Sequence, residues 1–148
     1  MNLSDNGESF IKGFEKLSLA AYQDQAGIWT IGWGHTGGVQ PGEEITPDQA
    51  ELYFKSDVAT AIGAVNRCVK VALTQNQFDA LVSFVYNIGA YAFKGSHVLE
   101  LLNDLNYLDA ANHLLKWDHV TIGGVLQESE GLLNRRMAER KLFLCPTT

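Results

Sequence analysis

The chain has 148 residues, a formal net charge of −6, and 46% hydrophobic against 19% charged residues. This length suffices for one domain that buries a core without a metal or disulfide scaffold, and the composition excludes disordered and fibrous proteins. The negative charge argues against nucleic-acid binding, no apolar run reaches the ~18 residues of a transmembrane helix, and the N-terminus lacks the basic and apolar regions of a signal peptide.

The first predicted elements are a short helix and a small sheet. Four apolar residues recur at a spacing that places them on one face of a helix: Phe10, Ile11, Phe14 and Leu17. Glu15 falls near the C-terminal end of this helix. From Tyr22 to Val39, β-forming residues alternate with glycines, which predicts short, twisted antiparallel strands.

A long helix is predicted next, because Thr46-Pro47-Asp48-Gln49 combines an N-cap threonine, a proline at the first helical position and a glutamine that closes a capping box. It should continue to about Val71. Thr74 and Gln77 form the same capping-box pattern and predict the start of a second helix, which is expected to end at Gly89.

Three more helices are expected in the remainder of the chain. Ser96 is the candidate N-cap of a helix with Val98, Leu101, Leu102 and Leu105 on its apolar face, and Asn106 of one with Ala110, Leu114 and Trp117. A turn at Gly123-Gly124 precedes a last helix from about Ser129 to Leu144. Its inward residues are expected to be Leu132, Leu133, Met137 and Leu142.

Together these elements predict an α+β fold in one domain with two lobes. The N-terminal helix and sheet form a lobe over about 1–45, the long helix links the lobes over about 47–71, and a helical bundle occupies about 72–148. Cys68 and Cys145 have no metal-ligand spacing and are interpreted as buried thiols or at most one bridge. The four histidines also form no metal-binding pattern, so no metal or cofactor is expected.

Two acids in unlike surroundings are candidates for glycosidic bond hydrolysis, which needs a proton donor and a second group to activate water. Glu15 follows an apolar residue at a helix end, where burial and the helix dipole disfavour a carboxylate, so it suits the acid role. Asp24 lies in a polar turn, where solvent and amide donors are expected to keep it charged, so it suits the base role.

The stretch from Phe14 to His35, FEKLSLAAYQDQAGIWTIGWGH, resembles the signature of phage-type lysozymes of glycoside hydrolase family 24. Glu15, Asp24, Thr30 and the IGWGH turn match the family pattern in identity and spacing. TPDQAELYFKSDV, LTQNQFDALVSFVYNIG and GLLNRRMAER are similar to the family's interlobe helix, its next helix and the Arg-rich final helix of endolysins from lambda-like phages. The resemblance implies a lysozyme-like fold.

The same resemblance implies roles for individual residues. Glu15 would protonate the leaving oxygen, while Asp24 and Thr30 position the water. His35 would be a structural residue paired with Asp57. Arg135 or Arg136 would reach Glu15 and orient it, with a solvated basic face as the alternative, and the sequence does not choose between the two arginines. Tyr86 and Asn87 would lie at the end of a cleft-lining helix.

The function expected from this resemblance is a muramidase that cuts the β-1,4 bond between N-acetylmuramic acid and N-acetylglucosamine in peptidoglycan, most simply with inversion. The alternatives are a lytic transglycosylase, which would not need Asp24 and Thr30 to hold water, and a wall-binding or tail module without turnover. The enzyme is expected to be a monomer without membrane insertion, to wait in the host cytoplasm, and to act on the wall in the periplasm. Many such endolysins are basic, whereas this chain is acidic, so its affinity should depend on cleft contacts.

Overall fold

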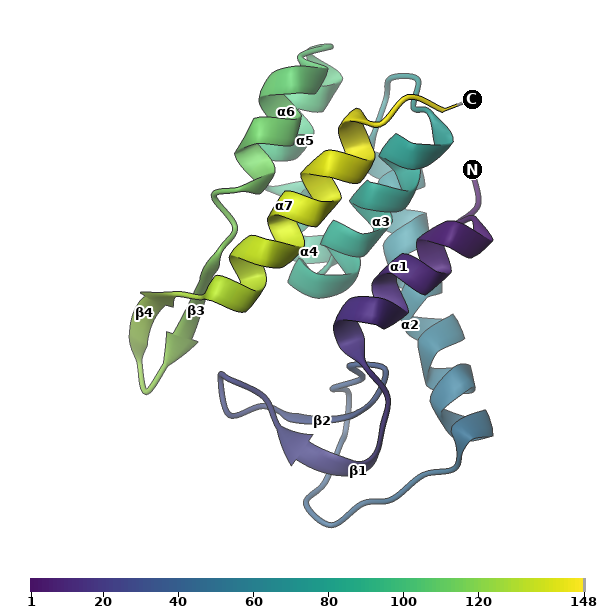
Figure 1. Ribbon diagram of the computed structural model, residues 1–148, viewed down its shortest axis with the longest axis vertical. Helices are drawn as coiled ribbons and strands as arrows, with labels where there is room; N and C mark the ends of the chain where they lie inside the picture. The colour runs from purple at the N-terminus through teal and green to yellow at the C-terminus, as the bar shows by residue number, and fades with distance from the viewer. Residues whose placement is uncertain (148) are drawn as a thin grey trace.

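The computed structural model describes residues 1–147, which form helices and two separate β-hairpins (Figure 1). The N-terminal half contains α1 (Asp5–Glu15), β1 (Ser18–Gln23), β2 (Trp29–Gly32) and α2 (Pro47–Cys68). The C-terminal half contains α3 (Gln75–Ile88), α4 (Ala90–Lys94), α5 (His97–Asn103), α6 (Tyr107–Leu114), β3 (His119–Ile122), β4 (Val125–Glu128) and α7 (Glu130–Leu144). The predicted α+β class is confirmed.

The capping signals place the helix starts as predicted. Thr46 and Thr74 each accept a hydrogen bond from the backbone N–H three residues on, and the glutamines at those positions, Gln49 and Gln77, bond back to complete both capping boxes. Gly89 ends α3 with a φ of 90°. The long helix α2 ends at Cys68, slightly before the predicted Val71.

The first hairpin begins earlier than predicted. β1 pairs antiparallel with β2, with Ser18 opposite Gly32 and Tyr22 opposite Thr30. The expectation that Leu17 extends the helical stripe is wrong, because α1 ends at Glu15 and Lys16 turns the chain with a φ of 54°. This sharp turn directs the chain from the helix into the sheet directly after Glu15.

The core lies in the helical bundle around α3, whose residues from Phe78 to Val85 are all buried. α3 packs against α1, α2 and α7, and Figure 1 shows these helices running alongside it. Ile11 of α1 belongs to this core. The first helix therefore packs on the bundle, while β1 and β2 extend from it.

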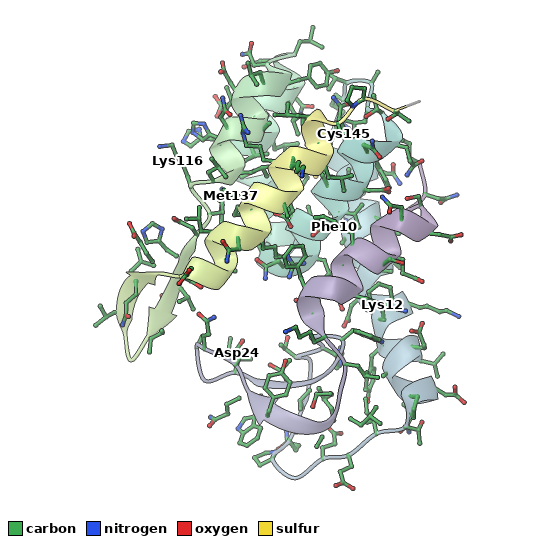
Figure 2. All side chains as sticks on the ribbon, viewed as in Figure 1. Phe10, Lys12, Asp24, Lys116, Met137 and Cys145 are labelled. Carbon is green, nitrogen blue, oxygen red and sulfur yellow. The ribbon has the colours of Figure 1, made fainter. Side chains whose placement is uncertain are left out.

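Several details of the C-terminal half differ from the expectations. Leu105 lies outside α5 with a positive φ of 66°, and Trp117 lies beyond the end of α6. Met137 was expected to face inward, but it is exposed and projects from the outer face of α7 (Figure 2). The buried positions of this helix are instead Arg135, Arg136, Glu139 and Phe143.

Both cysteines are free thiols, so the bridge is not formed. Cys68 is half-buried and Cys145 is exposed, which makes the expectation of two buried thiols wrong. None of the helices formed by residues 1–147 combines the length and apolar character needed to cross a membrane.

Candidate active site

A cleft of about 610 Å³ lies between the first hairpin and the helical bundle. Glu15, Asp24 and Thr30 all line it, although they come from a helix end, a turn and a strand. Its opposite wall includes Trp117, His119 and Arg135. Figure 2 shows Asp24 on the turn that faces the second hairpin across this space.

Glu15 is the last residue of α1, and its side chain is 15% exposed. Its Oε1 accepts a hydrogen bond of 2.7 Å from Nη1 of Arg135. Its carboxyl group also lies against the backbone of Gly34, where a Cβ would come within 2.9 Å of the Glu15 Cδ. The family resemblance implied that Arg135 or Arg136 would reach Glu15, and the guanidinium that fixes one of its oxygens is that of Arg135.

Asp24 is exposed in the turn between β1 and β2, as expected. Its Oδ1 accepts hydrogen bonds of 2.9 Å from the backbone N–H groups of Ala26 and Ile28. These donors hold the side chain in one orientation and leave Oδ2 available to another ligand. Gly27, with a φ of 80°, allows the chain to turn tightly enough for both contacts.

Thr30 is buried on β2, and its hydroxyl donates a 2.9 Å hydrogen bond to the backbone carbonyl of Ile28. Since the hydroxyl has one proton, its remaining capacity is to accept. Thr30 and Asp24 are therefore both acceptors on the same side of the cleft.

Arg135 and Arg136 are both buried, but only Arg135 contacts Glu15. Arg136 donates to Oδ1 of Asn87, and its Nη1 lies 2.9 Å from Oε1 of Glu139. The structure thereby resolves the choice that the sequence left open. Burial lowers the pKa of Arg136 to about 10, partly offset by Glu139, so it still carries its charge at neutral pH.

Glu139 and Ser83 were not anticipated as part of the site. Glu139 is fully buried, and its Oε2 accepts hydrogen bonds from the Ser83 hydroxyl at 2.6 Å and from Nε of Arg135 at 3.3 Å. Nη2 of Arg135 also donates to the Ser83 carbonyl at 3.2 Å. In the sequence, Glu139 lies within the charged run NRRMAERK, which is typical of a solvated helix face.

His35 and Asp57 are in contact, as expected. His35 Nδ1 lies 2.8 Å from Asp57 Oδ2, its Nε2 lies 3.0 Å from the Gly37 carbonyl, and its ring stacks on Tyr53 at a centroid distance of 4.1 Å. These contacts fix the turn after β2 to α2.

Two tyrosines that line the cleft have raised pKa values. Partial burial, followed by the carboxylates of Glu15 and Asp24, raises the pKa of Tyr22. Burial, followed by Glu15 and Asp57, raises the pKa of Tyr86 well above its usual range. The Tyr86 hydroxyl donates a 2.6 Å hydrogen bond to the Trp33 carbonyl.

The cleft is lined by two carboxyl groups and by a hydroxyl whose free capacity is to accept a hydrogen bond, a set that suits acid-assisted hydrolysis with a held water. Within residues 1–147, no three histidine, cysteine, aspartate or glutamate side chains converge as a metal site would require.

Comparison with protein families agrees with this geometry. The Phage lysozyme family matches residues 12–139, which is most of the chain. The chain belongs to the phage lysozyme family. This lysozyme is 43% identical to the endolysin of Acyrthosiphon pisum secondary endosymbiont phage 1, over 97% of this chain and 98% of that protein.

Two further comparisons define how far the likeness extends. The lysozyme is 44% identical to the endolysin of Bacillus phage B103 over 97% of this chain, but it spans only 54% of that protein. Its fold matches the endolysin from Escherichia coli O157:H7 phage FAHEc1 with a TM-score of 0.88 and 44% identity, covering 97% of this chain and 94% of that one. As a member of this family, the lysozyme is a glycoside hydrolase whose substrate is peptidoglycan, and neither alternative class is favoured.

Proposed function

We propose that Glu15 is the proton donor and that Asp24 and Thr30 hold the attacking water, so that the enzyme cleaves the β-1,4 bond between N-acetylmuramic acid and N-acetylglucosamine. The observation that carries this proposal is that these three residues, from three separate segments, line one cleft. In the reaction, the water oxygen bonds to the anomeric carbon as the glycosidic C–O bond breaks. The leaving oxygen takes the proton of Glu15, and Asp24 takes a proton from the water.

The hydrogen bonds of Thr30 and Asp24 support a water held in one orientation. The Thr30 proton is engaged by the Ile28 carbonyl, and Oδ1 of Asp24 by two backbone N–H groups. A water between them would donate one hydrogen to the Thr30 oxygen and the other to Oδ2 of Asp24. Its lone pair would then be directed at the sugar.

A water held in this way favours inversion, because it attacks the face of the sugar opposite the leaving group. The product released from a β-linked strand should then be the α-anomer. Proton NMR of freshly cut oligosaccharide, recorded before mutarotation, tests this. Initial β-product, or a covalent glycosyl adduct on Asp24, would contradict it and make Asp24 a nucleophile.

Glu15→Gln tests the acid assignment. We expect lysis of a peptidoglycan suspension to fall by at least about a hundredfold, the lower end of what a general acid contributes, with the circular dichroism spectrum unchanged. Glu8→Gln, at a half-exposed position on the same helix, is the matched control and should retain activity. A folded Glu15→Gln enzyme that clears walls at the wild-type rate would disprove the assignment.

Thr30→Ala tests the water site separately. Removing the hydroxyl should slow turnover without changing which anomer forms first, because Asp24 remains to receive the proton. If the variant is as fast as the wild type, Thr30 does not position the water. The anomer is followed by NMR and turnover by the release of reducing ends.

We propose further that the enzyme acts as a monomer and remains in the host cytoplasm until it is released to the wall. The cleft is built from residues of a single chain, so the chemistry needs no second copy. Light scattering after size exclusion tests the first point, with a mass near 16.3 kDa expected. Fractionation of infected cells before lysis tests the second.

A further inference from the structure

We propose that buried Glu139, together with Ser83, is a positioning residue for Glu15 that acts through Arg135. This inference rests on the proposed role of Glu15 as the proton donor. It assigns a function to a carboxylate that neither lines the cleft nor contacts Glu15.

Arg135 is the only connection between the two carboxylates among the contacts that the described residues make. Its Nη1 donates to Oε1 of Glu15 at 2.7 Å, while its Nε donates to Oε2 of Glu139 at 3.3 Å. A guanidinium is planar and rigid, so fixing one edge fixes the direction of the other. The orientation of Arg135 against Glu15 is therefore set by what holds it on the bundle side.

Ser83 completes this attachment from the neighbouring helix. Its hydroxyl donates to Oε2 of Glu139 at 2.6 Å, and its carbonyl accepts from Nη2 of Arg135 at 3.2 Å. The side chain of Arg135 is thus held by α3 and by its own helix, α7. All three groups are buried, where hydrogen bonds to charged groups are strong and cannot be replaced by water.

Arg136 explains why a carboxylate is needed at this point. Its guanidinium is also buried and lies 2.9 Å from Oε1 of Glu139, so one carboxyl group faces two cations. Burial raises the pKa of Glu139, and the charges of Arg136 and Arg135 oppose that rise. Without Glu139, two buried guanidinium groups would repel each other and Arg135 would lose its attachment. Since misplacement of a catalytic group by about 1 Å can cost on the order of a hundredfold in rate, the support of Arg135 affects turnover.

Glu139→Gln is the direct test, because the side chain keeps its shape and loses its charge. With soluble peptidoglycan fragments as substrate, we expect kcat to fall about tenfold and KM to stay within about twofold, since the cleft walls are unchanged.

Asp79→Asn is the matched control. Asp79 is a buried carboxylate on α3, one turn before Ser83, that accepts hydrogen bonds from the Ser4 backbone at 3.1 Å and from Gln75 at 2.8 Å. It has no contact with Arg135 or Glu15. This variant should lose stability while keeping its kcat and its KM, because only a structural role is removed.

Two further variants keep the proposal testable if Glu139→Gln fails to fold. Ser83→Ala removes one hydrogen bond and no charge, and it should lower kcat about threefold. In an Arg135→Met background, Ser83→Ala and Glu139→Gln should have no further effect on kcat, because the connection to Glu15 is already absent.

The outcomes separate this proposal from the acid assignment. If Glu15→Gln is inactive but Glu139→Gln and Ser83→Ala behave like Asp79→Asn, the positioning role is wrong and the acid role stands. If Glu15→Gln is fully active, the proposed function itself fails. Effects of Glu139→Gln that persist unchanged without Arg135 would also overturn the positioning role.

Discussion

The carboxyl group of Glu15 lies against the backbone of Gly34, in the turn that follows β2. Two properties of glycine are used at this one position. Its φ of 82° is unfavourable for other residues, and the space where a Cβ would stand is taken by the Glu15 carboxyl. The IGWGH turn is thus shaped around the carboxyl group of Glu15, the proposed proton donor, which comes from a different segment of the chain.

Gly34→Ala should therefore abolish lysis in a folded protein by displacing Glu15. Gly38→Ala separates this effect from backbone strain, because Gly38 has a φ of 72° but nothing within 4 Å of the added Cβ. Both variants should lose about 1–2 kcal/mol of stability from the left-handed backbone, but only Gly34→Ala should lose activity. Equal activities per folded molecule would show that Glu15 does not need this space.

Tyr86 provides a test of pH dependence. Its pKa is raised by burial, and its hydroxyl donates to the Trp33 carbonyl, so Tyr86→Phe should cost about 1–2 kcal/mol at neutral pH. A raised folded pKa means that the stability contributed is full below the unfolded value of about 10 and is lost as pH rises. The deficit of Tyr86→Phe should therefore shrink above about pH 10.

Denaturant unfolding between pH 8 and pH 11 checks this expectation. Tyr91, which is 94% exposed, is the matched control, and Tyr91→Phe should show a constant difference from the wild type across the range. A Tyr86→Phe deficit that grows with pH would contradict the predicted direction.

The residues that line the cleft were easier to predict from the sequence than the partners that each side chain contacts. Glu15, Asp24 and Thr30, which all line the cleft, were selected because a local motif specifies their type and spacing. Arg135 and Arg136 are adjacent on α7, and only the packing of α7 on α3 decides which one faces the cleft. The charge of Glu139 indicates solvent exposure in a sequence, so its burial depends on contacts made by residues far along the chain.

Among the elements, the β3–β4 hairpin is the main feature that sequence analysis reduced to a turn. Its two-residue Gly123-Gly124 loop has φ values of 58° and 80°, which is the pattern of a tight hairpin turn, flanked by HVTI and VLQE. Those strands are short and largely exposed, so no alternation of buried and exposed residues marks them. The short helix α4 was missed for a similar reason, since it has one helical turn and no side-chain cap.

The hairpin should open independently of the rest of the molecule. Valine at both Gly123 and Gly124 would force β-branched residues into a positive φ, which they strongly disfavour. We expect faster proteolytic cleavage within 119–128, with a Tm shift of less than about 4 °C because little of the hairpin is buried. KM should rise severalfold, since His119 and Val120 line the cleft.

Gly123→Asn is the control for this experiment, because asparagine tolerates a positive φ. This variant should be cut by the protease at the wild-type rate and should keep the wild-type KM for substrate. A global loss of folding in the double valine variant would show that the folding of the bundle depends on the hairpin.

At the scale of the molecule, the first hairpin and the bundle are joined around the cleft by specific polar contacts. Ser129, at the start of α7, donates to Gln25, the neighbour of Asp24, at 3.2 Å, and Tyr86 donates to the Trp33 carbonyl. The Arg135–Glu15 pair is a third such contact. We therefore expect substrate binding to depend on the fit between the two walls of the cleft more than on long-range attraction.

Because the net charge is −6, the dependence of lysis on ionic strength tests how much long-range attraction contributes to substrate binding. A cell wall that carries negative charge repels the enzyme weakly, and salt screens that repulsion, with a Debye length of about 8 Å at 0.15 M. We expect lysis to stay constant or rise between low salt and 0.15 M, whereas a basic lysozyme run alongside should slow. A severalfold loss with salt would show that a local basic surface drives binding.

The exposed thiol of Cys145 follows α7 at the end opposite Ser129 (Figure 2). With 15 residues in α7, the two ends are separated by about 22 Å at a rise of about 1.5 Å per residue. A maleimide at this position would attach a fluorophore or a solid support on the side away from the cleft, with the half-buried Cys68 replaced by serine to make the reaction selective. The immobilised enzyme would then present its open cleft outward, toward glycan strands in solution.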